Sequence, residues 1–285
     1  MSVNQKISII SLVILLAFPA AGYFYYKKTH PKYIPIPRPE INIRIKEGWN
    51  LRQIADDWKN KGIVSSTENI YNLLGQPAYN YEMQGKTAPV LALANDSRWA
   101  EIFFDKPDDS SYEGYLFPDT YTIYQDSDLN EILEKIFENL ESKITIEMRA
   151  EIKKQGKTIF EILNMASIVE KEAPDEKNMA MVADIFWRRL DEGMALQSCA
   201  TVNYVTGKSL PAVSAADKAI DSQYNTYKYR GLPPGPISNP SLTAIKATIY
   251  PEKNNYVYFM SGSDGVIHYA KTLEEHNINV YKYLK

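Results

Sequence analysis

The pattern of apolar and polar positions divides the chain into short strands and many amphipathic helices. Alternation predicts strands over 41–45 and 120–124, and a hairpin of 256–259 with 266–269 across Asp264-Gly265. Apolar residues at helical spacing predict helices from Leu51 and after Ser65 or Ser66, over 129–140, 144–154, 159–173, 175–193 and 242–249, and after Thr272. Short strands beside segregated helices indicate the α+β class for residues 111–285.

Local signals mark the ends of several of these helices. Asn50 with Gln53 forms a capping box, and Thr272 with Glu275 forms another. Asp175 caps the helix that Gly193 ends. Asn239-Pro240 is predicted as the N-cap and first residue of the helix through Leu242.

The first strand and the two helices after it form a unit of about 35 residues, which is too small to fold alone and should dock on the C-terminal part of the chain. Residues 40–110 are therefore expected to hold this subdomain and its connection. Residues 111–285 are expected to form a larger domain, and Pro31, Pro35, Pro37 and Pro39 make a stiff linker over 31–39.

Residues 1–30 carry a nearly uninterrupted apolar run, Ile7–Tyr26, which is long enough to span a bilayer. The run ends in the aromatic residues 23–26 and two lysines, as a membrane anchor does. A cleaved signal peptide is the alternative, because small residues follow the apolar core at 17–21. Length and the aromatic continuation favour a retained anchor.

The charges beside this run suggest an orientation. Lys6 precedes it, whereas Lys27, Lys28 and Lys32 follow it. The positive-inside rule alone would therefore place the bulk of the protein in the cytoplasm.

Composition and charge exclude several classes of function. A net charge of −3 does not support nucleic-acid binding, which normally needs a basic surface. The single cysteine, Cys199, excludes an internal disulfide and a cysteine-based metal cluster. The three histidines, His30, His268 and His276, lack zinc-site spacing, so no metal site and no cofactor are expected.

The helix over 159–173 carries the most informative side chain. On a helical wheel, Glu170 falls on the apolar side, with Asn164 and Ser167 on the polar side and Glu172 well away. The apolar side consists of Ile159, Ile162, Leu163, Ala166, Val169 and Ala173. A carboxyl group on an apolar face has a raised pKa, as a general acid requires. A buried glutamate paired with Arg or Lys would show the same pattern.

Seven segments in order resemble the MltG (YceG-like) endolytic murein transglycosylases. They are EGYLFPDTY at 113–121, ASIVEKEA at 166–173, LQS at 196–198, YNTY at 224–227, GLPPGP at 231–236, Tyr258-Phe259 and Glu275-His-Asn277. Together with the anchor and the strand-helix-helix unit, which looks like the family's LysM-like subdomain, the resemblance covers nearly the whole chain. One departure is Cys199-Ala200, where the family usually has Asp-Pro.

The resemblance implies a single-pass enzyme of the bacterial cytoplasmic membrane with its catalytic domain on the outer side. It would cut nascent peptidoglycan glycan strands between N-acetylmuramic acid and N-acetylglucosamine, with peptidoglycan synthases as partners. The family's catalytic glutamate falls on Glu170. This placement of the catalytic domain outside the membrane is opposite to the orientation that the flanking lysines predict. We prefer the placement that the resemblance implies, because the charges of one short flanking segment are a poor signal of orientation.

The supporting site residues are expected to hold sugar or peptide groups or to support the cleft. They are Glu113, Gln197, Ser198, Tyr224, Asn225, Tyr227 and Asn239.

Two other functions stay open. One is a hydrolase that uses Glu170 with Glu113 or Asp119, since hydrolysis needs two carboxylates. The other is a non-catalytic scaffold that binds the wall. A lytic transglycosylase needs one carboxyl group, as general acid and then base, and it leaves a 1,6-anhydro end; this fits the missing Asp beside Ser198 better.

Overall fold

The computed structural model describes residues 23, 25–29, 37–210 and 212–284. The chain divides after Pro39, and the part that follows forms one compact unit; in the part before it, residues 25–29 are helical and exposed. The predicted span Ile7–Tyr26 lies largely outside the described residues. Within the described part, none of the helices combines the length and apolar character needed to cross a bilayer.

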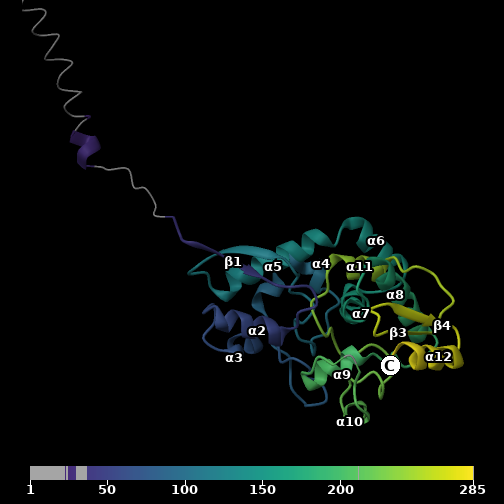
Figure 1. Ribbon diagram of the computed structural model, residues 1–285. Helices are drawn as coiled ribbons and strands as arrows, with labels where there is room; N and C mark the ends of the chain where they lie inside the picture. The colour runs from purple at the N-terminus through teal and green to yellow at the C-terminus, as the bar shows by residue number, and fades with distance from the viewer. Residues whose placement is uncertain (1–22, 24, 30–36, 211, 285) are drawn as a thin grey trace, which may run out of the picture. The chain divides into compact units, whose positions relative to one another are not determined.

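The compact unit combines two small sheets with many helices, which confirms the α+β class (Figure 1). The strands are β1 (Glu40–Arg44), β2 (Thr120–Tyr124), β3 (Tyr258–Ser261) and β4 (Ile267–Ala270). The longer helices are α2 (Leu51–Asn60), α3 (Thr67–Leu74), α5 (Leu129–Lys143), α6 (Ile146–Lys154), α7 (Ile159–Glu172), α8 (Glu176–Asp191), α9 (Cys199–Thr206), α11 (Leu242–Ile249) and α12 (Leu273–Tyr283). Short helical turns are η1 (Ala92–Asn95), η2 (Ser97–Trp99), α4 (Ala100–Phe103) and α10 (Ala215–Lys218).

The strand of the predicted subdomain at 40–110 pairs with a strand of the larger region at 111–285. β1 and β2 are antiparallel, with Ile43 opposite Tyr121, and the amide of Ile45 donates to the carbonyl of Asp119 at 2.9 Å. Ile43 and Ile123 are buried on one face of this ribbon. The regions on either side of residue 110 therefore share a sheet and a core.

Helix α7 lies at the centre of the unit, packed against α4, α6, α8, α9 and α11 (Figure 1). Ile162, Leu163 and Val169 have no exposed surface. Each such side chain contributes about 1.5–3 kcal/mol of hydrophobic free energy. The prediction of one buried side was wrong, because Asn164 and Ser167 on the opposite side are also fully buried.

The proline-rich loop at 231–240 covers the polar side of α7 and makes hydrogen bonds to it. Nδ2 of Asn164 donates to the carbonyl of Pro233 at 2.7 Å. Oγ of Ser167 accepts from the amide of Ile237 at 2.9 Å, and Ser238 Oγ donates to the Ser167 carbonyl at 3.1 Å. Polar residues of this helix thus bind a loop, which a helical wheel cannot distinguish from solvent.

Most predicted helix ends are confirmed. Asn50 and Gln53 form the capping box of α2, and Asp175 and Thr272 cap α8 and α12. The prediction for Asn239-Pro240 was wrong, because Ser241 caps α11 and its hydroxyl accepts from the amide of Ala244. Asn239 instead uses its side chain to join distant segments.

The region around 194–240 contains two helices that the sequence pattern did not predict. They are α9 and the one-turn α10. The hairpin β3–β4 and the last helix are confirmed, with strand bounds shifted by up to two residues.

Candidate active site

The last turn of α7 carries two carboxyl groups, each of which meets the N-terminus of another helix. Glu170 contacts Ser241, the N-cap of α11. Glu172 contacts Ser198, the N-cap of α9. Both side chains are partly exposed, whereas residues 162–169 are fully buried. The last turn of α7 is thus the part of this central helix that becomes accessible to solvent.

Glu170 is held through one oxygen. Its Oε2 accepts from the amide of Ser241 at 3.0 Å and from the Ser241 hydroxyl at 2.6 Å. Among the described residues, Oε1 has no hydrogen-bond partner. A carboxyl group oriented by one oxygen and open at the other can pass a proton to a bound molecule.

Burial raises the pKa of Glu170, and the hydrogen bonds from Ser241 only partly oppose this. The neighbouring Glu47 also raises this pKa, while Lys171 lowers it. The position at the C-terminus of α7 acts in the same direction as burial, because a helix C-terminus disfavours negative charge. The pKa of Glu170 is therefore shifted upward, which is the direction that general-acid catalysis requires.

The turn before α2 forms a wall of this site. Gly48 has a φ of +68°, and a Cβ there would lie 3.3 Å from Cγ of Glu170. Its amide donates to the carbonyl of Asn239 at 2.9 Å, and Lys171 Nζ lies 3.4 Å from its carbonyl. Glycine is needed here both for the left-handed backbone and for the close approach of the side chain. The subdomain at 40–110 thus contributes directly to the surroundings of Glu170.

Glu172, like Glu170, accepts hydrogen bonds from the N-terminus of another helix. The Ser198 hydroxyl and the amide of Ala200, at 3.5 Å, donate to its Oε1. Burial raises the pKa of Glu172, whereas the hydrogen bonds and the nearby Arg189 oppose this. The wheel placed Glu172 away from Glu170, and the structure agrees, but it gives both residues a raised pKa.

Gln197 is exposed and has a φ of +55°. A non-glycine residue in this conformation costs on the order of 1–3 kcal/mol and persists only where the surroundings impose it. Its amide donates to the carbonyl of Thr226 at 3.1 Å, and the amide of Ser198 donates to the Thr226 hydroxyl at 3.1 Å. The buried Arg189 donates to the carbonyl of Leu196 on the other side.

The segment 224–227 supports this turn. Asn225 has no exposed surface, and its Nδ2 donates to the carbonyls of Lys218 and Ile220, both at 2.9 Å. Tyr224 is also buried and packs against Tyr204 at 5.2 Å between ring centroids. Tyr227 is partly exposed, and its hydroxyl lies 3.1 Å from the thiol of Cys199. Of these three predicted site residues, Tyr227 alone has surface to offer a ligand.

Glu113 and Asn239 form a buried junction beneath the site. Oε1 of Glu113 accepts from Asn239 Nδ2 at 3.0 Å, and Oε2 accepts from the amide of Leu51 at 2.9 Å and the hydroxyl of Tyr204 at 3.0 Å. Burial raises the pKa of Glu113 to about 7. Neither Glu113 nor Asn239 has exposed surface. Neither side chain therefore has surface with which to contact a bound molecule.

Asn239 connects three segments of the chain. Its Oδ1 accepts from the amide of Leu116 at 2.8 Å, and its Nδ2 and backbone amide both donate to the carbonyl of Trp49, at 2.9 and 2.8 Å. Two residues later, Ser241 binds Glu170. The junction thus holds the segment whose Ser241 orients the carboxyl group of Glu170.

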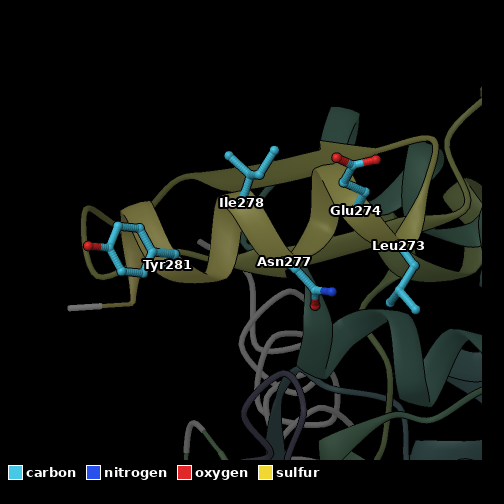
Figure 2. Close-up of a pocket in the computed structure, with 5 residues that line it drawn as sticks. All are labelled: Leu273, Glu274, Asn277, Ile278 and Tyr281. Carbon is cyan, nitrogen blue, oxygen red and sulfur yellow. The ribbon is translucent and has the colours of Figure 1, made fainter.

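A shallow hollow on α12 lies outside this cluster. Leu273, Glu274, Asn277, Ile278 and Tyr281 line it, along one helix (Figure 2). No predicted site residue contributes to it. The described part of the chain also contains no group of three or more His, Cys, Asp or Glu side chains that could hold a metal ion.

The structure brings Gln197, Ser198 and Tyr227 to the Glu172 side of the α7 terminus. Sequence reasoning missed Ser241, Gly48 and Arg189, which orient or frame the two glutamates. Only Ser241 had a signal, since a serine before an apolar helical segment is a good N-cap.

Comparison with known proteins agrees with the segments that suggested a family. The model of the YceG-like family matches residues 28–282. A crystal structure of a YceG-like protein from Listeria monocytogenes superposes with a TM-score of 0.66, at 32% identity, over 83% of this chain and 74% of that one.

Two curated relatives are named endolytic murein transglycosylase. The one from Bacillus subtilis is 38% identical over 86% of this chain and 65% of its own length. The one from Streptococcus pneumoniae strain R6 is 32% identical over 85% of this chain and 44% of its own length. The chain thus spans about two thirds of the length of the first relative and less than half of the length of the second. With the family model matching from residue 28 to residue 282, the chain belongs to the YceG-like family.

Proposed function

We propose that this protein is an endolytic murein transglycosylase that cleaves peptidoglycan glycan strands between N-acetylmuramic acid and N-acetylglucosamine. The name of both curated relatives supports this activity. The observation that carries the proposal is Glu170, a partly exposed carboxyl group with a raised pKa, oriented through Oε2 by Ser241.

Glu170 acts first as general acid and then as base. Its proton goes to the glycosidic oxygen as the bond to C1 of N-acetylmuramic acid breaks. The same carboxylate then takes the proton of the C6 hydroxyl, whose oxygen closes on C1 to give the 1,6-anhydro end. Water is not consumed and the enzyme regains its proton, so one carboxyl group is enough.

The surrounding residues divide into those that contact the substrate and those that hold the site together. Gln197 and Tyr227 have exposed surface, and we assign them to sugar or peptide groups. Glu113, Ser198, Tyr224, Asn225 and Asn239 are buried and act through their neighbours.

The geometry disfavours the hydrolase that uses Glu113 or Asp119. Glu113 is fully buried, and protein donors occupy both of its oxygens. The carboxyl group of Asp119 binds the amide of Thr120 and Asn139 on α5. Glu113 is thus closed to a bound molecule, and protein donors bind each carboxyl oxygen of Asp119.

We further propose that the protein is anchored in the bacterial cytoplasmic membrane by the apolar run 7–26, with the compact unit on the outer side. The length of that run supports the anchor. In this position the enzyme meets nascent strands, and peptidoglycan synthases are its expected partners.

The test is product analysis with purified peptidoglycan. The wild type should release muropeptides with 1,6-anhydro ends, and Glu170→Gln should release none while remaining folded. Glu138→Gln makes the same chemical change at an exposed position of α5 and should keep full activity. Full activity of Glu170→Gln would reject the assignment of Glu170, and binding without any soluble product from the wild type would favour the scaffold.

A further inference from the structure

The strained turn at Gln197 has no structural role that requires a glutamine. Its backbone conformation is one that glycine adopts without cost, yet the residue is a glutamine with an exposed side chain. Among the described residues, its carboxamide makes no hydrogen bond. The fold therefore holds a polar side chain at a costly backbone position and leaves its donor and acceptor groups free.

Three contacts impose this conformation. Arg189 fixes the residue before the turn, through the carbonyl of Leu196. Thr226 binds the amides of Gln197 and Ser198, through its carbonyl and its hydroxyl, each at 3.1 Å. Glu172 binds the Ser198 hydroxyl and the amide of Ala200. These contacts hold the backbone of the turn and leave the Gln197 side chain at the surface.

One of these three contacts comes from the proposed catalytic helix. Glu172 is two residues after Glu170 in the last turn of α7. Since the two carboxyl groups share the last turn of α7, the turn that carries Gln197 and the carboxyl group of Glu170 are linked through one helix. Two residues that must act on the same substrate need such a link.

The chemistry of the free group indicates what it binds. A carboxamide offers an N–H donor and a C=O acceptor side by side. An acetamido group offers the complementary pair, and both sugars that flank the bond in the proposed substrate carry one at C2.

We propose that Gln197 recognises the acetamido group of an amino sugar beside the bond that Glu170 cleaves, and that Glu172 is a positioning residue that fixes Gln197 through Ser198. This inference rests on the proposed function. It makes N-acetylation of the glycan a determinant of cleavage at this site.

The experiment compares ordinary glycan strands with strands from which the N-acetyl groups have been removed, using the full-length protein in detergent. The wild type should cleave acetylated strands with a kcat/KM about tenfold to a hundredfold higher, because the deacetylated sugar leaves the carboxamide unpaired. Gln197→Gly should lose this preference, since its rate on acetylated strands falls to the rate on deacetylated ones. Its Tm should equal or exceed that of the wild type, because glycine relieves the strain.

A second set of variants tests the positioning role. Glu172→Ala should raise KM for acetylated strands, and Glu172→Gln should restore it, because a side-chain carbonyl can still accept from Ser198 and Ala200. Adding Glu172→Ala to Gln197→Gly should cost nothing further in kcat/KM, whereas independent roles would add. Ser198→Ala removes the same hydrogen bond and gives a second route to this comparison.

The outcomes separate this inference from the proposed function. If Gln197→Gly keeps the wild-type preference, or if the wild type shows none while still producing anhydro ends, the inference is wrong and the proposed function stands. If the wild type cleaves neither kind of strand, both are wrong.

Discussion

Glu170 and Glu113 are two carboxyl groups with a raised pKa for the same physical reason, but their surroundings differ. Burial raises the pKa of both. Glu113 has no exposed surface, and its oxygens accept from Leu51, Tyr204 and Asn239. Glu170 is partly exposed, and Ser241 occupies only one of its oxygens.

This difference shows that a raised pKa identifies burial and does not by itself identify catalysis. A catalytic acid also needs an oxygen that a ligand can reach. Glu170 meets this criterion, as our proposal requires, whereas Glu113 has both oxygens occupied and ties β1–α2 to the loop carrying Ser241. Substitutions at and around the two residues should separate these roles.

The largest effect on activity is expected for Glu170→Gln. Losing a general acid and base should lower kcat by about 10²–10⁴-fold or more. The fold should keep its stability, because the glutamine carbonyl can accept both hydrogen bonds from Ser241. Turnover and thermal unfolding measured on the same preparation check this. A low Tm in this variant would mean that Glu170 is also structural.

Glu113→Ala should, by contrast, mainly lower the stability of the fold. It leaves the amide of Leu51, the hydroxyl of Tyr204 and Nδ2 of Asn239 without their acceptor in the interior. We expect a loss of about 3–5 kcal/mol in the free energy of unfolding, measured with denaturant. Wild-type stability in this variant would contradict the role of the junction.

The pH dependence of stability should distinguish the same two residues. Because the pKa of Glu113 is raised to about 7 in the folded protein, the folded state binds a proton that the unfolded state has released above its ordinary pKa near 4.5. Stability from this group is therefore complete below about pH 4.5 and is lost as the pH rises to about 7, by about 3 kcal/mol. Glu113→Gln should abolish this part of the fall in unfolding free energy between pH 5 and 8, whereas Glu170→Gln should leave most of it. A profile unchanged by Glu113→Gln would contradict the assignment.

The smallest expected effect is that of Ser241→Ala. Losing the cap of α11 should cost about 1 kcal/mol of stability. Since hydrogen bonds from Ser241 lower the pKa of Glu170, its removal should raise that pKa and move the alkaline limb of the pH profile of kcat/KM to higher pH. Thr145→Ala removes the cap of α6 and should cost similar stability without moving the profile.

The sequence allowed the elements with strong periodicity and clear caps to be predicted. These include the strand at 41–45 and the helices from Leu51 and Asp175. Helix α9 was missed because residues 194–240 are dominated by turn-forming residues, and few of their apolar positions recur at helical spacing. The burial of Asn164 was missed because its partner, the carbonyl of Pro233, lies 69 residues away.

The site could be predicted only in part for the same reason. Glu170 could be proposed from the pattern of its own helix, but the groups that surround its side chain come from distant turns at Gly48 and Ser241. Gln197 was named as a site residue, yet its backbone strain depends on contacts with Thr226 and Arg189 that no local pattern reveals.

The central claim is that Glu170 alone serves as acid and then base, without water as a nucleophile. Digestion of peptidoglycan in water enriched in oxygen-18, followed by mass spectrometry of the released muropeptides, tests it most directly. The account predicts 1,6-anhydro ends without the heavy isotope, formed by the wild type and absent with Glu170→Gln. Reducing ends that carry oxygen-18, formed by the wild type in place of anhydro ends and absent with Glu170→Gln, would show hydrolysis and would contradict it.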